Sequence, residues 1–171
     1  MKLIKEEVKY KNYRQVLLRT FEDENGKQWE YETSGSIYGS SSIIALTEDN
    51  QIILVREFRP GPMKEFLDIP GGGLDSNDED PVDCAMRELT EETGYVGKKA
   101  TLLGKIFDGA YISSPKYAVL IEGCVFKEGS KIEDIEVVLK PYDEYLENLK
   151  PEDTVNLSAI LLFKEYLRKK K

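Results

Sequence analysis

One helix with a clearly marked start and stop constrains this chain more than any other feature. A glycine-rich, acidic loop over residues 70–79 precedes it, and the spacing predicts a helix over residues 81–93. Asp80 suits the N-cap, Pro81 suits the first helical position, and Gly94 suits the C-terminal stop. Its apolar face consists of Val82, Ala85, Met86, Leu89 and Thr93. The rest of the chain must supply a core that buries this face.

Three glutamates lie beside the apolar face of this helix. Glu88, Glu91 and Glu92 are three and four residues apart, so their carboxylates share one side at the edge of the core. Their mutual repulsion grows when burial lowers the dielectric constant, and a divalent cation would relieve it. Hard carboxylate oxygens suit Mg²⁺ or Mn²⁺, and Arg87 can brace one carboxylate. A solvated acidic helix face is the alternative interpretation.

The remainder of the chain is predicted to be rich in strands. Without regular alternation of strand and helix, the pattern indicates an α+β fold or a mixed-sheet sandwich. Residues 1–36 are predicted to form an N-terminal antiparallel β extension, and residues 37–171 a catalytic domain. The run Ile52–Val55 is typical of a strand buried on both faces. Strands are expected at 13–21, 28–33, 37–46, 51–58, 66–69, 101–107, 117–126 and 135–139, and further helices near 142–149 and 154–169.

Composition excludes several kinds of chemistry. The chain has no histidine, which removes histidine-based nucleophile systems and histidine-ligated zinc. Its 171 residues carry 24 Lys and Arg against 32 Asp and Glu, a net charge of −8 that disfavours nucleic acid as a partner. Cys84 and Cys124 are far apart and predict neither a disulfide nor a zinc site. No apolar run is long enough to span a membrane, so a cytoplasmic protein is expected.

The segment from Gly73 to Tyr95 resembles the Nudix box, G-x5-E-x7-R-E-U-x-E-E-x-G-U, in which U is a bulky apolar residue. Leu89 fills the first U slot, and Tyr95 is a mild departure in the last. With residue frequencies of ~5–7%, a chance match is below about one in a million. The seven positions of fixed type all match: Gly73, Glu79, Arg87, Glu88, Glu91, Glu92 and Gly94.

This resemblance implies a Nudix hydrolase, whose fold is a mixed-sheet α/β/α sandwich. Such an enzyme binds Mg²⁺ and cleaves a nucleoside diphosphate linked to another group. Glu91, Glu92 and Arg87 are therefore candidate catalytic residues. The implied roles are Glu88 and Glu92 as main metal ligands with Glu91 assisting, the carbonyl of Gly72 as a further ligand, and Glu79 and Arg87 as orienting groups.

Residues 55–60 (VREFRP) and 66–73 (FLDIPGGG) resemble the ADP-ribose and nucleoside-diphosphate-sugar pyrophosphatase branch of this family. There the arginine that matches Arg59 contacts substrate phosphate, and Arg56 is a second candidate for substrate binding. The N-terminal extension fits the same branch, where it packs across a two-fold axis and helps form the partner's nucleoside pocket, so a homodimer is expected. Aromatic residues that could stack on a base, although strand aromatics more often pack, are Tyr10, Tyr13, Trp29 and Tyr31.

Residues 132–138 resemble the loop that carries the catalytic base in this branch. Glu133 is the first candidate to activate water and Glu128 the second, while Lys131 stands where some members place the base. Ser113-Ser114-Pro115 resembles a Ser-Pro landmark of ADP-ribose pyrophosphatases, but it leads directly into Lys116, where those enzymes have a longer loop with an acidic residue.

The predicted function is Mg²⁺-dependent hydrolysis of a nucleoside diphosphate sugar. ADP-ribose is the leading candidate, with AMP and ribose 5-phosphate as products, and another nucleotide sugar stays open. Cleanup of a different nucleoside diphosphate or triphosphate derivative is a second enzymatic interpretation. A Nudix fold that only senses a nucleotide is a third, disfavoured because every glutamate of the box is present.

Overall fold

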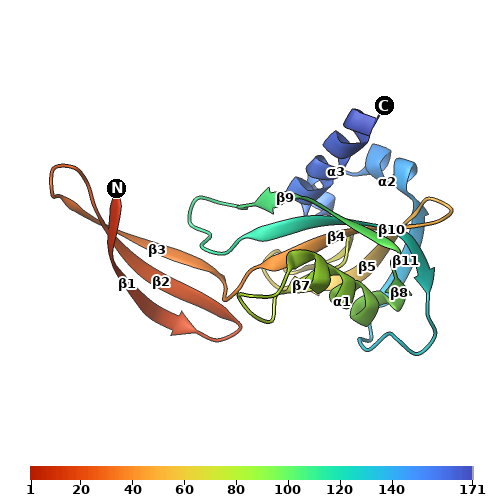
Figure 1. Ribbon diagram of the computed structural model, residues 1–171, viewed down its shortest axis with the longest axis horizontal. Coiled ribbons are helices and arrows are strands. Elements are labelled where there is room, and N and C mark those ends of the chain that lie inside the picture. The colour runs from red at the N-terminus through yellow and green to blue at the C-terminus, as the bar shows by residue number, and fades with distance from the viewer. Residues whose placement is uncertain (171) are drawn as a thin grey trace.

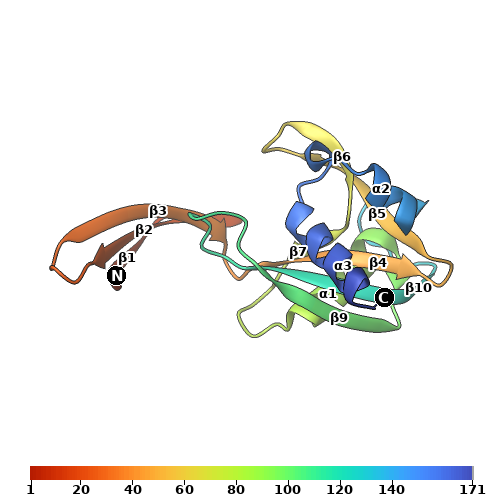
Figure 2. The ribbon, with the colours of Figure 1, turned by 90° about the horizontal axis from the view of Figure 1, so that it is seen from above.

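The computed structural model describes residues 1–170 and places them in two sheets (Figure 1). An antiparallel sheet of β1 (Lys2–Lys11), β2 (Arg14–Glu22) and β3 (Gln28–Ser36) projects from one end of the molecule in both views (Figure 2). The main sheet contains β4 (Ser40–Thr47), β5 (Gln51–Arg59), β6 (Lys64–Asp68), β7 (Gly71–Gly73), β8 (Tyr95–Val96), β9 (Lys99–Ile106), β10 (Lys116–Phe126) and β11 (Glu136–Pro141).

The main sheet is mixed and is covered by helices on both faces. Its strand order is β11-β5-β4-β10-β8, with β10 parallel to β4, and β6, β7 and β9 pair with β5, β4 and β10. Helix α1 (Pro81–Thr93) lies on one face, and α2 (Tyr142–Asn148) and α3 (Leu157–Lys170) lie on the other. This confirms the predicted α/β/α sandwich with an N-terminal antiparallel extension. Within residues 1–170, no helix has the length and apolar character that crossing a bilayer requires.

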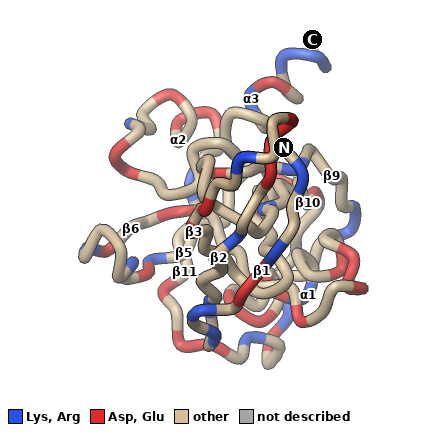
Figure 3. Tube along the Cα trace, turned by 90° about the vertical axis from the view of Figure 1, so that its left-hand side faces the viewer, with Lys and Arg blue, Asp and Glu red and all other residues tan. Residues whose placement is uncertain are grey.

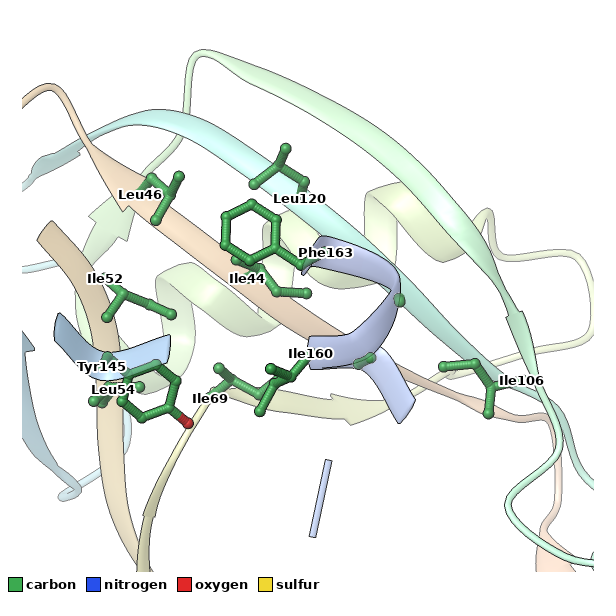
Figure 4. Packing of buried hydrophobic residues seen from close by; sticks show 12 residues of the cluster. Ile44, Leu46, Ile52, Leu54, Ile69, Ile106, Leu120, Tyr145, Ile160 and Phe163 are labelled. Carbon is green, nitrogen blue, oxygen red and sulfur yellow. The ribbon is translucent and has the colours of Figure 1, made fainter. Parts of the chain in front are cut away.

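The core consists of two clusters, one on each face of the main sheet, because successive strand residues point to opposite faces. Figure 4 shows Phe163 and Ile160 of α3 packed over Ile44 of β4. The cluster below α1 includes Ile53, so the strand predicted to be buried on both faces is confirmed. Members of the first cluster are Ile44, Leu46, Ile52, Leu54, Ile69, Ile106, Ala118, Leu120, Tyr145, Ala159, Ile160 and Phe163. Members of the second are Ile43, Ala45, Ile53, Ala85, Leu89, Val119, Ile121 and Cys124.

Three stretches that sequence patterns left outside strands are strands: the ten-residue β1, the three-residue β7 and the two-residue β8. In β1, lysines and glutamates separate the apolar residues, so no buried face is visible in the sequence, and pairing with β2 forms the strand (Figure 3). The three glycines of β7 were predicted to be loop. They pair with β4, and a Cβ on Gly71 would lie 2.3 Å from the carbonyl oxygen of Ser41, so only glycine allows this approach.

Helix α3 begins at Leu157, not at the predicted Thr154. The hydroxyl of Thr154 donates to both carboxylate oxygens of Asp68, at 2.8 and 2.9 Å, and accepts from the backbone N–H of Asn156. These bonds keep residues 154–156 outside the helix, because a buried carboxylate such as that of Asp68 must be satisfied by donors.

The N-terminal sheet is attached to the main sheet through the connection between β9 and β10. The backbone of Ser34 exchanges hydrogen bonds with Tyr111 and Ser113, both 2.9 Å long, and the N–H of Ser36 donates to Oγ of Ser114 at 3.0 Å. This connection therefore lies against β3, as Figures 1 and 2 both show. The division into residues 1–36 and 37–171, with separate roles, stays a prediction.

Candidate active site

Helix α1 has the ends that its sequence predicts. The side chain of Asp80 accepts a 2.7 Å hydrogen bond from the N–H of Val82, and Pro81 opens the helix. Gly94 adopts a left-handed conformation with φ of 77°, which glycine accepts without strain, and donates to the carbonyl of Thr90. These caps fix the register of the helix, and thereby the direction of its glutamates.

Arg87 joins the carboxylates of the loop and the helix. Its Nη1 donates to Glu88 at 2.8 Å and to Glu91 at 3.3 Å, and its Nε donates to Glu79 at 3.2 Å. Nη2 also donates to the carbonyl of Gly73 at 3.1 Å. Arg87 was predicted to brace one carboxylate and in fact contacts four, because its Nε also lies 3.5 Å from the carboxylate of Asp75, so it fixes the loop before α1 as well as the helix.

Glu92 is the one glutamate of the box that Arg87 does not contact. Its side chain is 5% exposed, and the N–H of Gly71 donates to it at 3.2 Å. Burial raises the pKa of the Glu92 carboxyl to about 8, and the negative charges of Glu57, Glu88 and Glu133 add to the effect. Burial also raises the pKa of Glu88, although Arg87 opposes that shift.

The glycine-rich strand β7 lies directly against Glu88. A Cβ on Gly72 would be 2.1–2.3 Å from the carboxylate atoms of Glu88, so any larger residue here would displace that carboxylate. The missing side chain brings the backbone of Gly72 beside the carboxylates of α1. Sequence resemblance had placed Gly72 and Glu88 in one metal site, and the structure brings these two residues together.

These residues fit a divalent cation by their chemistry. Two buried carboxylates with raised pKa values lie close together, and a cation would stabilise their charged forms. Within residues 1–170, no three Asp, Glu or Cys side chains are already arranged to hold a metal ion. Arg87 contacts Oε1 of Glu88 and Oε2 of Glu91, so the second oxygen of each carboxylate is left for a cation shared with Glu92.

Glu133 is anchored at the end of α1. The backbone N–H groups of Ile132 and Glu133 donate to the carbonyl of Glu91 at 2.9 and 3.1 Å. The negative charge of Glu133 contributes to the raised pKa values of Glu88 and Glu92. Glu128 is exposed on the preceding turn. The first candidate for the base is therefore near the box glutamates. Lys131 is engaged elsewhere, since its Nζ donates to the carbonyl of Ile135.

A pocket of about 330 Å³ adjoins this site and is bordered by Gly71 and Gly72. Arg59 lines it, and its guanidinium forms a paired contact with Glu57 through Nη1 (3.0 Å) and Nη2 (2.9 Å). The Nε of Arg59 is buried and has no hydrogen-bond partner among residues 1–170. Arg56 lies outside the pocket and donates to Glu136 at 2.9 Å.

The four candidate stacking aromatics are separated in the structure. Tyr13 lines the mouth of the pocket and is 81% exposed. Trp29 donates through its indole nitrogen to Asp23 near the β2–β3 turn, and Tyr31 packs against Phe21. Tyr10 is exposed on β1. Within this chain, Tyr13 is thus the member of the set that the fold brings to the site.

Sequence reasoning missed the other polar residues of this region. Glu57 precedes Arg59 by two residues on β5, so strand periodicity could have placed both side chains on one face. Lys116, Asp108 and Asn156 also line the pocket, but they come from three different parts of the chain. No local pattern brings residues from such separate segments together.

Comparisons with known proteins identify the family of this chain. The profile described as "NUDIX domain" matches residues 38–159. The ADP-ribose pyrophosphatase of Bacillus subtilis (strain 168) is 32% identical over 148 residues, 78% of this chain and 77% of that protein. The ADP compounds hydrolase NudE of Escherichia coli (strain K12) is 27% identical over 84% of this chain and 80% of its own length.

A crystal structure of an ADP compounds hydrolase has a TM-score of 0.79 and 25% sequence identity to this chain. The match covers 99% of this chain and 96% of that one, so it includes the N-terminal sheet. Together with the box residues gathered around α1, these matches show that the chain belongs to the Nudix family and is a pyrophosphohydrolase of the ADP-ribose pyrophosphatase branch.

Proposed function

We propose that the protein hydrolyses the pyrophosphate bond of a nucleoside diphosphate sugar in the presence of Mg²⁺, with ADP-ribose as the leading substrate and AMP and ribose 5-phosphate as products. The observation that carries this proposal is a buried acidic site that adjoins a pocket bearing Arg59. The pocket volume is at the lower end of the range of small-molecule sites. The similarity to ADP-ribose and ADP-compound hydrolases supports the same substrate class.

In this proposal Glu88, Glu92, Glu91 and the carbonyl of Gly72 hold the metal ion. A bound Mg²⁺, or Mn²⁺ in its place, would neutralise diphosphate charge and lower the pKa of water. Arg87 keeps the carboxylates oriented through the contacts described above. The structure holds these groups on rigid elements, which favours a pre-organised site.

Two further groups act on the substrate and on water. Arg59 binds phosphate oxygens through its free Nε and through donors now directed to Glu57. Arg56 stays a second, weaker candidate because it lies outside the pocket. Glu133 accepts the proton of the attacking water, which requires only a carboxylate near the box glutamates, and Glu128 is the alternative base.

We also propose a homodimer in which the extension of residues 1–36 contacts the partner and completes its nucleoside pocket. The extension exposes several apolar side chains, such as those of Leu3, Val8 and Tyr13. Light scattering should give twice the 19.5 kDa mass of one chain. The mass of a single chain would contradict the dimer. A cytoplasmic location belongs to the same proposal.

The decisive experiment incubates the purified protein with Mg²⁺ and a panel of nucleotides. The panel contains ADP-ribose, other nucleoside diphosphate sugars, dinucleoside polyphosphates and an oxidised nucleoside triphosphate, and the products are resolved by chromatography. We expect turnover of at least one nucleoside diphosphate sugar, and its loss on adding EDTA. Preferential turnover of the triphosphate would favour the cleanup interpretation, and no turnover of any compound would contradict catalysis.

A further inference from the structure

The inner wall of the pocket carries a lysine–aspartate pair that the proposed mechanism does not use. Lys116 is the first residue of β10, and its Nζ lies 2.7 Å from Oδ2 of Asp108 in the β9–β10 connection. Nζ is also 3.5 Å from Oδ1 of Asn156, which precedes α3. All three residues line the pocket that adjoins Gly71 and Gly72.

Hydrogen bonds to neighbouring residues fix the positions of Asn156 and Asp108 in this wall. Asn156 is 7% exposed, donates through Nδ2 to Asp68 at 3.0 Å, and accepts from the hydroxyl of Ser42 at 2.8 Å. The hydroxyl of Ser158, near the start of α3, donates to the other oxygen of Asp108 at 3.2 Å. Polar groups fixed in advance lose little conformational freedom when they bind a ligand.

The backbone also fixes the place of the lysine. The β9–β10 connection ends at Pro115, whose carbonyl accepts a 3.1 Å hydrogen bond from the N–H of Ser40, and Lys116 then pairs with Ser40 across the parallel strands. The side chain of Lys116 is 23% exposed at the pocket. Asp108 is 35% exposed, so both charged groups are accessible to a ligand.

The charges of the pair select the chemistry of that ligand. Lys116 and Asp108 together are neutral, so an anion gains from the lysine but is repelled by the aspartate. An apolar ring would leave the ammonium and carboxylate groups without new partners. A sugar hydroxyl can donate to the carboxylate, and a neighbouring hydroxyl can accept from the ammonium. Neighbouring hydroxyls of a sugar therefore suit the pair best.

We propose that Lys116 and Asp108 form a subsite that binds the hydroxyls of one sugar of the substrate, with Asn156 positioning the lysine. The subsite rests on the proposed function, because it assumes that a nucleoside diphosphate sugar occupies the pocket. Such a substrate has two sugars, the ribose of the nucleoside and the distal sugar. The subsite makes the enzyme discriminate against a substrate in which the recognised sugar lacks a hydroxyl.

The test measures binding in the presence of Mg²⁺, with every ligand in a non-hydrolysable form whose diphosphate carries a bridging CH₂ group in place of oxygen, so that hydrolysis does not interfere. Calorimetry compares ADP-ribose with two analogues, one lacking the 2′-hydroxyl of the adenosine and one lacking the 2-hydroxyl of the distal ribose. The wild type should bind ADP-ribose about tenfold more tightly than one of the analogues, consistent with one lost hydrogen bond, and that analogue identifies the sugar. In Lys116→Met and Asp108→Asn this preference should fall to less than about threefold.

Lys99→Met is the matched control. Lys99 belongs to the same β9–β10 pair, its ammonium contacts Glu122 at 3.4 Å, and it lies outside the pocket. This variant should keep the full preference. Because the preference is a ratio within one variant, a loss of folded protein does not imitate the expected result.

Three results would overturn the subsite: a wild type that binds neither ADP-ribose nor its analogues, a wild type without preference, or Lys116→Met and Asp108→Asn variants with the wild-type preference. Turnover with Mg²⁺ is measured separately. A wild type that binds with the expected preference but hydrolyses nothing would refute the proposed function and leave the subsite intact.

Discussion

Helix α1 and the N-terminal sheet differ in what holds them in place. In α1, Ala85 and Leu89 are fully buried against the main sheet, and both ends are capped. In the N-terminal sheet the buried side chains are confined to Leu17 and Thr20, and Val8 is 56% exposed. Backbone pairing and the contact of β3 with the β9–β10 connection hold this sheet.

The same difference distinguishes the two halves of the candidate site, which are the acidic residues beside α1 and the outer rim of the pocket. The acidic half is built by contacts within one segment, between β7 and the end of α1, and it holds the metal ion in the function proposed above. The outer rim of the pocket includes Tyr13 and Arg14, which reach it from the N-terminal sheet. We therefore expect changes on α1 to lower kcat, and changes on the N-terminal sheet to raise KM.

The largest effect is expected from Glu92→Gln. This change keeps the size of the side chain but removes the charge of the most deeply buried box glutamate, and kcat for ADP-ribose should fall at least about a hundredfold, as for loss of a principal electrostatic stabiliser. Steady-state kinetics at saturating Mg²⁺ measures it. A fall of less than about tenfold would show that Glu92 is not a main metal ligand.

Two further glutamates serve as references for that experiment. Glu133→Gln should also lower kcat strongly, by about a hundredfold, if its carboxylate takes the proton from water. Glu128→Gln, on the exposed turn, should stay within about twofold of the wild type because it removes only a solvated charge. The reverse order would transfer the role of base to Glu128.

A smaller effect, in the other kinetic constant, is expected from the N-terminal sheet. The double substitution Tyr13→Ala and Arg14→Ala removes two side chains from the pocket rim, so KM should rise about tenfold while kcat stays within about twofold. Tyr10→Ala is the control, since Tyr10 is an exposed aromatic of β1 outside the pocket. An unchanged KM in the double variant would show that this sheet does not contribute to substrate binding in either chain.

The same contrast explains what the amino-acid sequence could predict. Helix α1 was predicted with its caps because Asp80, Pro81 and Gly94 act on their immediate neighbours. The burial of β5 on both faces was predicted from four consecutive apolar residues. The strands β1 and β7 were missed, since Lys, Glu and Gly carry little strand preference and pairing with a distant partner decides their conformation.

Prediction of the site was limited in the same way. The positions of Glu88, Glu91 and Glu92 follow from helical spacing, and Glu133 could be matched by resemblance. By contrast, the Lys116–Asp108 pair depends on how the β9–β10 connection meets the start of α3. Residues joined by tertiary contacts of this kind leave no periodic pattern in the sequence.

The smallest expected effect is a pH dependence of stability that belongs to α1 and not to the N-terminal sheet. In the folded protein the pKa of Glu92 is about 8, against a usual value of 4.5. Between these values the folded chain holds a proton that the unfolded chain has lost, so the free energy of unfolding falls as pH rises through this window. In EDTA, Tm of the wild type should fall several degrees between about pH 6 and pH 8.5, whereas Tm of Glu92→Gln should change less. Tyr13→Ala with Arg14→Ala should keep the wild-type slope, because neither residue contacts Glu92. Equal slopes in the wild type and Glu92→Gln would mean that the buried carboxyl is already ionised in the folded chain.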